Sequence, residues 1–332
     1  MRDTREALHP ALMRDSDRAI WDSRARLQRT RDLRADAPTR VPSQDERLTR
    51  IRQGVYARAE DLDGAPHGVQ YLARIEATAQ ARRAPIFARE SALAVHGVPY
   101  GREPERVFTI GGASTAGLKA GVQHARVTIA ADDVVQERGL LVCSLPYALA
   151  DTARHRDQRV AVAAIDAALH EQLVSKEAIL DALSRQSRVG QARARASIAF
   201  AEGAAESVGE SWSRVVLQLL GFPAPELQPA VRGASGRWWH PDFRWRLADL
   251  PRPLLGEFDG MTKYGDLAAR EGLTPQQALA REKRREDDLR AENDTVHWIW
   301  GDVTTPKRLE RILLARGVPR IRPSSLWLPG DR

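Results

Sequence analysis

Residues 237–260 read RWWHPDFRWRLADLPRPLLGEFDG, and three acidic residues in this stretch decide how the chain is interpreted. Asp242 begins one short apolar run, and Glu257 and Asp259 stand two residues apart near the end of a second. Residues i and i+2 of a strand point to the same face, so Glu257 and Asp259 are expected to project together. If the two runs pair, three carboxylates meet. Such a cluster normally holds a cation, and oxygen-only ligands suit Mg²⁺ or Mn²⁺. The sequence therefore predicts a metal-dependent phosphodiesterase site.

The surrounding sequence predicts the elements that carry these acids. Apolar residues recur at helical spacing from Val208 to Leu220, so a helix that contains Glu210 and ends at Gly221 is expected there. Strand patterns, Gly-rich loops and caps place the other elements. These are two strands within 227–245 joined by the loop Gly233–Gly236, a strand over Leu254–Phe258, a helix from the capping box Thr274–Gln277 to about Asn293, a strand over 296–300 and a helix from Pro306 to Gly317. The predicted order is helix, three strands, helix, strand, helix.

This order, with acids at these points, resembles the PD-(D/E)XK nuclease superfamily, and more narrowly the bacterial domains related to very-short-patch-repair endonucleases. In that pattern a helix glutamate is followed by an aspartate on one strand and an acidic pair on the next. The matching residues are Glu210, Asp242, Glu257 and Asp259. Asp259 replaces the usual lysine, an exchange that recurs within this branch, and Lys263 stands where relatives often have a histidine. The segment EKRREDDL, with Arg285, matches a second recurrent phrase.

The resemblance implies a restriction-endonuclease-like α-β-β-β-α-β domain that cleaves DNA with Mg²⁺ or Mn²⁺. Asp242 and Glu257 are the expected metal ligands, and Asp259 is a third ligand or orients the attacking water. Glu210 would hold a further water or a second metal. Lys263 would reach a phosphate oxygen or that water, and Arg285 would contact a phosphate. The catalytic set is thus Glu210, Asp242, Glu257, Asp259 and Lys263.

Each of these residues also has a purely structural interpretation. Asp242 can cap a turn after Pro241, and Glu257 can pair with an arginine on an exposed sheet. The whole domain can be a nuclease fold kept as a scaffold after losing activity. Five tryptophans invite a base-stacking role, but in a small sheet they are more often core. They are Trp238, Trp239, Trp245, Trp298 and Trp300.

Composition adds only broad limits. The net charge is +7 and the pI is near 9.9, a balance that favours polyanionic partners such as nucleic acid. Only five of the 51 basic residues are lysines, which is as typical of a high-GC genome as of phosphate binding. One cysteine, Cys143, suggests a buried residue in a reducing cytoplasm. No apolar stretch is long enough to cross a membrane and no secretory signal is present, so a cytoplasmic protein is expected.

The N-terminal 65 residues are the basic end of the chain. A helix is expected around Asp15 to Arg34, and LTRIRQGVYARAED, with Gly54 at its centre, predicts a strand pair or wing. This wing resembles that of the winged helix in AbiEi-type antitoxins, the repressor partners of type IV toxin–antitoxin systems. The resemblance implies that Arg50, Arg52 and Arg58 touch DNA phosphates. A basic solvated surface is the alternative.

Residues 66–198 further resemble the AbiEi-type proteins through FARESALAVHGVP, RVFTIGG, GVQHARVTIAADDVV and GLLVCSLPYALADTARHRDQRVAVAAIDAALH. Physically these phrases predict a helix ending at Gly97, strands over 106–110, 122–129 and 140–143, and a long helix over 160–173, followed by a short helix capped by Ser175. The histidines are spread apart and are expected to be structural. GGASTAG, at 111–117, lacks the spacing of a nucleotide-binding loop and is expected to be a turn.

The chain as a whole is therefore expected to be α+β, with a winged-helix-like region (1–65), a mixed α+β domain (66–198), a nuclease-like domain (199–318) and a tail (319–332). Two functions stay open: a DNA endonuclease with an N-terminal DNA-binding or recruitment region, and an antitoxin-type regulator on an inactive nuclease scaffold. The first is preferred because its acids are all present. Expected partners are DNA and, under the resemblance, a nucleotidyltransferase-like toxin. Nucleases of this kind often dimerise, so a homodimer is a further expectation.

Overall fold

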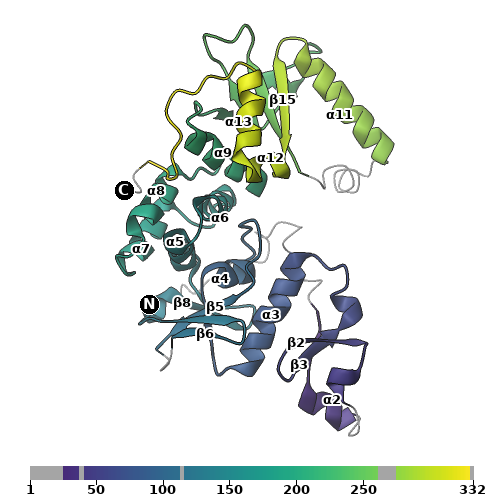
Figure 1. The fold of residues 1–332 in the computed structure, drawn as a ribbon, viewed down its shortest axis with the longest axis vertical. Helices are drawn as coiled ribbons and strands as arrows, with labels where there is room; N and C mark the ends of the chain where they lie inside the picture. Colours follow the sequence, from purple (N-terminus) through teal and green to yellow (C-terminus); the bar gives the residue numbers. More distant parts are fainter. Residues whose placement is uncertain (1–24, 37–40, 113–115, 261–273, 330–332) are drawn as a thin grey trace, which may run out of the picture. The chain divides into compact units, whose positions relative to one another are not determined.

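The protein is described here from a computed structural model, which covers residues 25–36, 41–112, 116–260 and 274–329. The fold is mixed α and β, as expected (Figure 1). Contacts divide the chain into two compact units. Unit 1 comprises residues 1–156 and 171–194, and unit 2 comprises 157–170 and 195–332. Residues 158–170, which the sequence groups with the middle region, therefore pack with the C-terminal unit. No helix among the described residues is both long and apolar enough to cross a membrane.

The basic N-terminal region forms a three-stranded antiparallel sheet in the order β1-β3-β2. Its elements are β1 (Leu27–Arg29), α2 (Thr30–Asp36), β2 (Leu48–Arg52), β3 (Val55–Arg58) and α3 (His67–Ala81). The strand pair expected around Gly54 is confirmed, and Gly54 takes the positive φ of 77° that its tight turn requires. Of the helix expected over 15–34, the described part is confirmed for residues 30–34, which belong to α2, and is wrong for Leu27–Arg29, because these residues pair with β3 and this pairing overrides helical propensity.

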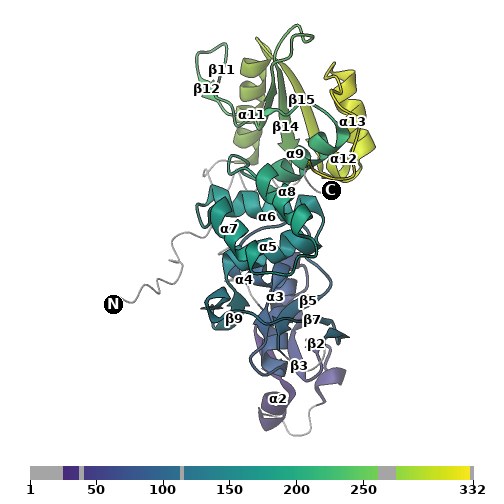
Figure 2. The ribbon, with the colours of Figure 1, turned by 90° about the vertical axis from the view of Figure 1, so that its left-hand side faces the viewer.

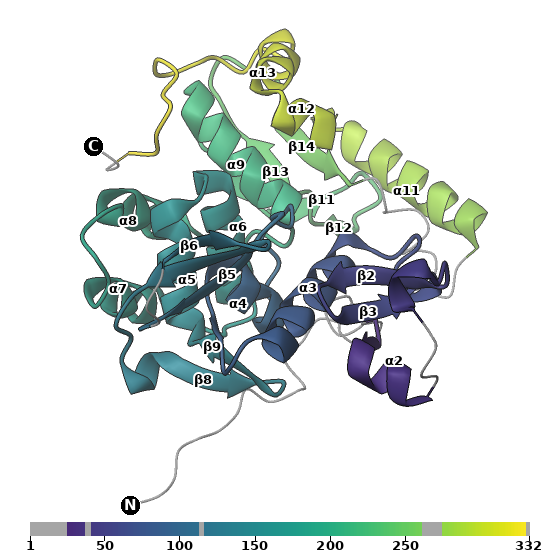
Figure 3. The same cartoon turned by 60° about the horizontal axis from the view of Figure 1, so that its bottom comes forward.

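The middle of unit 1 is a six-stranded sheet in the order β6-β7-β5-β4-β9-β8. Helix α4 lies against β5 and β9, and α5 packs on α4 and α7 (Figure 3). The elements are β4 (Ile86–Phe87), α4 (Arg89–His96), β5 (Val107–Gly111), β6 (Gly117–Lys119), β7 (Val122–Arg126), β8 (Val134–Glu137), β9 (Leu140–Cys143), α5 (Leu145–His155) and α7 (Lys176–Ser184). The predicted helix end at Gly97 and the Ser175 cap are confirmed. His96 is buried and its Nε2 donates to the Cys143 carbonyl at 2.8 Å, a structural role.

Unit 2 is built on a four-stranded sheet in the order β10-β13-β14-β15, in which β14 and β15 are parallel and the other pairs are antiparallel. The helix α11 covers one face, and α9, α12 and α13 cover the other (Figures 1 and 2). The elements are α6 (Gln158–His170), α9 (Val208–Leu220), β10 (Glu226–Leu227), β11 (Val231–Arg232), β12 (Trp238–Trp239), β13 (Phe243–Trp245), β14 (Leu254–Asp259), α11 (Pro275–Arg290), β15 (Asp294–Ile299), α12 (Trp300–Thr304) and α13 (Pro306–Ala315). Helix α8 (Gln191–Phe200) spans the boundary between the units.

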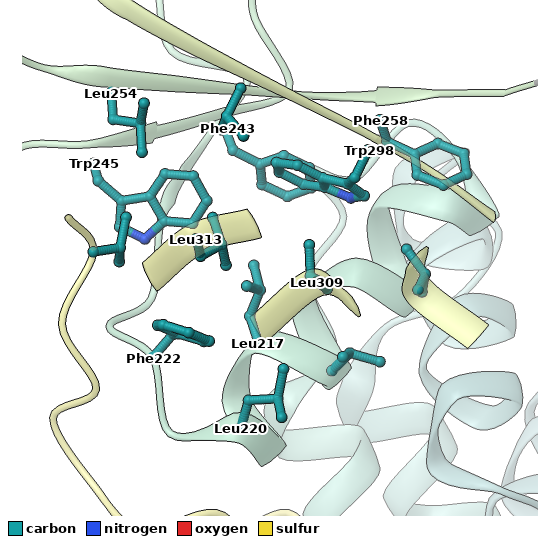
Figure 4. Close-up of a cluster of buried hydrophobic side chains, with 14 residues drawn as sticks. Leu217, Leu220, Phe222, Phe243, Trp245, Leu254, Phe258, Trp298, Leu309 and Leu313 are labelled. Carbon is teal, nitrogen blue, oxygen red and sulfur yellow. The ribbon is translucent and has the colours of Figure 1, made fainter. Parts of the chain in front are cut away.

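The main core of unit 2 lies between this sheet and α9, α12 and α13 (Figure 4). Trp245 and Trp298 are fully buried, and Phe243 stacks against Trp298 with ring centroids 5.2 Å apart. Truncating one of these rings to alanine is expected to cost about 3–5 kcal/mol. Gly256 makes this packing possible, because a Cβ there would lie 2.6 Å from the Trp298 ring. The expectation that the tryptophans are core thus holds for Trp245 and Trp298.

The expectation is wrong for Trp238, whose exposed fraction is 64%. The reason is that residues 227–245 do not form the two continuous strands that the sequence predicts. Two prolines, Pro229 and Pro241, interrupt the segment 227–245, and a proline cannot donate to a sheet ladder. The segment therefore forms β10 and β13 in the main sheet and a separate β11–β12 hairpin, on which Trp238 is exposed.

Candidate functional site

Three of the predicted acids are buried at one end of the unit 2 sheet. Glu210 comes from the first turn of α9, Asp242 directly precedes β13, and Glu257 lies within β14. Their exposed fractions are 6%, 9% and 5%, although acidic residues are rarely this buried without partners. Sequence separation is large, so only the fold brings these residues to one region.

Gln228 joins Glu210 to Asp242. Its side-chain Nε2 donates to Glu210 Oε2 at 3.0 Å and lies 3.4 Å from Asp242 Oδ1. Its backbone N–H donates to the Asp242 carbonyl at 3.0 Å. The backbone of Gln228 has a φ of 44°, a left-handed conformation that costs free energy for a residue other than glycine. One amide nitrogen therefore contacts two carboxylates, which are held close together.

Asp242 also lies beside the strand that carries Glu257. Asp242 Oδ2 accepts a 2.7 Å hydrogen bond from the backbone N–H of Phe258, the residue after Glu257. The strand register agrees, because Phe243 pairs with Gly256 and the preceding residue thus faces Glu257. The glycine Gly209 lets α9 approach this strand, since a Cβ there would lie 2.0 Å from the Phe258 ring. The convergence of Glu210 with the β13 and β14 acids thus depends on a small residue next to it.

Burial and crowding change the protonation of Glu210. Burial raises its pKa first, and the neighbouring Asp242 carboxylate raises it further, to about 7. Hydrogen bonds from the Glu206 N–H at 3.0 Å and the Ser207 hydroxyl at 2.7 Å act in the opposite direction and do not compensate. The proximity of the two carboxyl groups therefore favours a proton on Glu210 near neutral pH, and a cation bound beside them would favour its ionised form.

Glu257 is engaged by an arginine from α11. Arg285 Nη2 lies 2.6 Å from Glu257 Oε1 and 3.4 Å from the His240 carbonyl, and Nη1 lies 2.9 Å from Glu282 Oε1. Burial lowers the pKa of the Arg285 guanidinium, but Glu257 and Glu282 outweigh burial and leave it raised. Arg285, predicted to contact a phosphate, thus lies at the site itself, with its positive charge placed on an expected metal ligand.

Asp259 points to a partner that sequence reasoning missed, His297 on β15. His297 Nδ1 lies 3.1 Å from Asp259 Oδ2, and Nε2 lies 3.5 Å from Glu286 Oε1, an ion-pair distance rather than a hydrogen bond. The hydrogen bond with Asp259 raises the pKa of His297, and burial only partly offsets this. The strand register explains the contact between Asp259 and His297. Strands β14 and β15 are parallel, and His297 pairs with Glu257. Asp259 is two residues after Glu257, so its side chain lies on the same face of the sheet and next to His297. Strand alternation in 294–299 was the available signal, since His297 alternates with the buried Val296 and Trp298.

A hard divalent cation fits these residues by the chemistry of the donor set. Glu210, Asp242 and Glu257 offer only carboxyl oxygens, the donor type that such ions prefer. As the side chains stand, however, no three His, Cys, Asp or Glu residues in the described part of the chain converge as a metal-binding group. The Arg285 contact accounts for this at Glu257. Lys263 lies outside the described residues.

The three wing arginines differ in their surroundings. Arg50 on β2 is exposed. Arg52 turns inward, with Nη1 3.3 Å from both the Thr78 hydroxyl and the Ala120 carbonyl, and burial followed by Arg82 lowers its pKa. Arg58 is exposed and pairs with Glu60 at 3.0 Å. Arg50 and Arg58 are therefore accessible to a phosphate, whereas Arg52 stabilises unit 1.

The β11–β12 hairpin is fixed to α11 by Asp288. This carboxylate accepts hydrogen bonds from the Ser235 N–H and hydroxyl and, at 2.6 Å, from the Trp239 indole. Arg237 lies over the Trp239 ring, 5.9 Å from its centroid. Trp238 projects from the same hairpin and is exposed. An aromatic surface flanked by arginine thus sits two residues from His240, whose carbonyl contacts Arg285.

Comparisons with known proteins identify distant relatives but no function. Two uncharacterized proteins of Mycobacterium tuberculosis, from strains CDC 1551 / Oshkosh and H37Rv, are each 36% identical to this chain over 108 residues. The match covers 32% of this chain and 40% of each relative, so the chain spans about two fifths of the curated relatives' length. No family model and no solved structure matches the chain. The functional argument therefore rests on the site.

Proposed function

We propose that unit 2 is a metal-dependent DNA endonuclease of the PD-(D/E)XK type, with the acids of α9, β13 and β14 as its active site. The observation that carries the proposal is the Glu210–Gln228–Asp242 arrangement beside Glu257. These three acids are buried and lie on α9 and beside the two central strands, β13 and β14, of the four-stranded sheet. The buried Asp166 of the same unit has an arginine partner, Arg214, at 2.7 Å, whereas Glu210 has no ion-pair partner within the described residues.

Mg²⁺ or Mn²⁺ would be held by Asp242 and Glu257, with Asp259 as a third oxygen donor or as the group that orients water. When bound, the ion neutralises charge on the phosphodiester and lowers the pKa of a coordinated water. Gln228 orients the Asp242 carboxylate, and Glu210 holds a proton on its carboxyl or accepts one from nearby water.

Arg285 has a second role in this proposal. Its guanidinium is a planar donor that binds carboxylate and phosphate equally well. When DNA is bound, Arg285 would contact a phosphate oxygen in place of Glu257, and the Glu257 carboxylate would then be available to hold the cation. The exposed Trp238 on the adjacent hairpin supplies a stacking surface for a base. Lys263, as the sequence predicts, would contact a phosphate or the attacking water.

Plasmid nicking tests this proposal directly. The full chain is incubated with supercoiled plasmid and Mg²⁺ or Mn²⁺, alongside Asp242→Asn and a matched control, Asp249→Asn, which alters an exposed aspartate outside the site. Nicking by the wild type and the control, abolished by chelator and by Asp242→Asn, supports the endonuclease. Nicking that survives Asp242→Asn, or none with either metal, contradicts it.

One observation favours the second candidate, an antitoxin-type regulator. The β2–β3 hairpin is a formed wing with Arg50 and Arg58 exposed. Under this proposal the wing contacts DNA phosphates, a nucleotidyltransferase-like toxin is the protein partner, and unit 2 is a scaffold. Gel shifts with Arg50→Gln, against the exposed Arg316→Gln as control, test the wing. Two results together would favour the regulator. The protein would bind promoter DNA specifically, with only Arg50→Gln weakening this binding, and it would not nick plasmid DNA.

A further inference from the structure

Unit 1 contains a cavity of about 480 Å³ that is lined by three arginines. Arg89 begins α4, Arg106 precedes β5, and Arg156 follows α5. The one acidic residue that lines the cavity is Glu105. The volume lies within the range of small-molecule sites, and the lining carries an excess of positive charge.

Two of the arginines are held in place by buried carboxylates behind them. Arg89 Nε lies 3.2 Å from Asp151 Oδ2, and its guanidinium lies over the Phe108 ring, 5.4 Å from the centroid. Arg156 pairs with Glu90, which has no exposed surface. The Arg89 backbone has a φ of 50°, a left-handed conformation at a residue with a long side chain. A strained backbone and two buried acids thus orient guanidinium groups toward an open cavity.

The third arginine is not neutralised. Arg106 is exposed, and within the described residues its side chain has no acidic group at ion-pair distance. Thr109 and Gln123 add polar atoms to the wall, and Phe108 and Ile110 add apolar surface. The cavity therefore combines fixed cationic donors with a part-apolar wall, the composition expected for a ligand with an anionic and an uncharged part.

We propose that this cavity binds a phosphate-bearing small molecule of about mononucleotide size. Planar guanidinium groups match phosphate oxygens in pairs, and three of them on one wall suit a group with more than one negative charge. The proposal concerns unit 1 alone and does not depend on the endonuclease.

Isothermal titration calorimetry on the full chain tests the proposal with AMP, inorganic pyrophosphate and uncharged adenosine. AMP and pyrophosphate are expected to bind, and adenosine at the same concentration is not. Arg106→Gln is expected to weaken AMP binding roughly tenfold, the effect of losing one charge-assisted hydrogen bond. The control Arg126→Gln alters an exposed arginine on β7 that does not line the cavity, and it should leave affinity within about twofold.

A second variant, Gln123→Glu, adds a negative charge to the wall and should weaken AMP binding without removing an arginine. The phosphate can belong to a free nucleotide or to the end of a nucleic acid. Binding of short single-stranded DNA with a 5′-phosphate, compared with the same DNA without it, distinguishes these two sources. The proposal is overturned if neither AMP nor pyrophosphate binds at millimolar concentration. It is also overturned if adenosine binds as well as AMP, or if Arg106→Gln and Arg126→Gln behave alike.

Discussion

The two units each contain buried carboxylates, but the neighbours of these carboxylates differ: arginines in unit 1, and amide groups and a second carboxyl group at Glu210 in unit 2. In unit 1, Asp151 and Glu90 each face arginines, and Arg106 is left over at the cavity. In unit 2, Glu210 and Asp242 accept hydrogen bonds from the Gln228 amide and from backbone N–H groups, and Arg285 is engaged with Glu257. An exposed arginine is thus left at the unit 1 cavity, whereas two carboxyl groups lie side by side in unit 2.

The pKa values of two buried acids, Asp151 in unit 1 and Glu210 in unit 2, show the effect of these different neighbours. Burial raises the pKa of both Asp151 and Glu210. At Asp151 the hydrogen bond from His155, together with Arg89 and Arg154, outweighs burial and leaves the pKa lowered. At Glu210 the neighbouring Asp242 adds to burial, and the pKa reaches about 7. Two acids with the same exposed fraction therefore have pKa values shifted in opposite directions, because one has cationic neighbours and the other has a carboxylate neighbour.

The largest expected effect is on catalysis. Asp242→Asn keeps the hydrogen bond acceptor beside the Phe258 N–H but removes the charge. We expect metal-dependent nicking to fall by about 10³-fold, the size of effect seen when an electrostatic group is lost from an active site. Single-turnover rates measure this, and Asp249→Asn should keep the wild-type rate. A loss below about threefold would mean that the negative charge of unit 2 has no catalytic use.

Arg285→Gln tests whether a metal ion can replace the guanidinium. The variant leaves Glu257 buried without its cation, and breaking a buried pair in this way costs roughly 3–5 kcal/mol. In the presence of a chelator, the variant should have a lower melting temperature than the wild type. Adding Mn²⁺ should restore part of this difference. Arg316→Gln serves as the control. A loss that Mn²⁺ leaves unchanged would mean that Arg285 is a structural partner of Glu257 only.

The pH dependence of stability tests the crowding at Glu210. Because the folded pKa of about 7 exceeds the ordinary value of 4.5, the folded state binds the extra proton. This contribution to stability is complete below about pH 4.5 and is lost as pH rises through about 7. Glu210→Gln should remove this loss and gain on the order of 3 kcal/mol over the wild type between pH 5 and pH 8. Urea unfolding of both proteins at pH 5 and at pH 8 measures this difference in stability. A difference that is the same at both pH values would contradict a raised pKa of Glu210.

The smallest expected effect is on DNA binding by the β11–β12 hairpin. Trp238→Ala removes an exposed ring and should leave the melting temperature unchanged. Loss of one stacked base is expected to weaken single-stranded DNA binding by about 1 kcal/mol or more, roughly fivefold. Fluorescence anisotropy with a labelled oligonucleotide measures it, and exposed Leu326→Ala is the control. Equal affinities in the two variants would remove Trp238 from the proposed interface.

Sequence reasoning predicted what local patterns encode. Gly54, Gly97, Ser175 and the Thr274–Gln277 capping box mark their turns and helix ends correctly, because caps and positive φ depend on few residues. It also placed Glu210, Asp242 and Glu257 on the right elements. Contacts set by register or by tertiary pairing were missed. Gln228 and His297 become visible only once β10 pairs with β13 and β15 lies parallel to β14.

The most direct test of the central claim is Mn²⁺ binding to the full chain, followed by electron paramagnetic resonance. The account predicts that the wild type and Asp249→Asn bind Mn²⁺ with similar affinity, and that Asp242→Asn binds at least about tenfold more weakly, since one carboxylate ligand is lost. Mn²⁺ that remains free with the wild type, or that binds Asp242→Asn just as tightly, would contradict a cation site in unit 2.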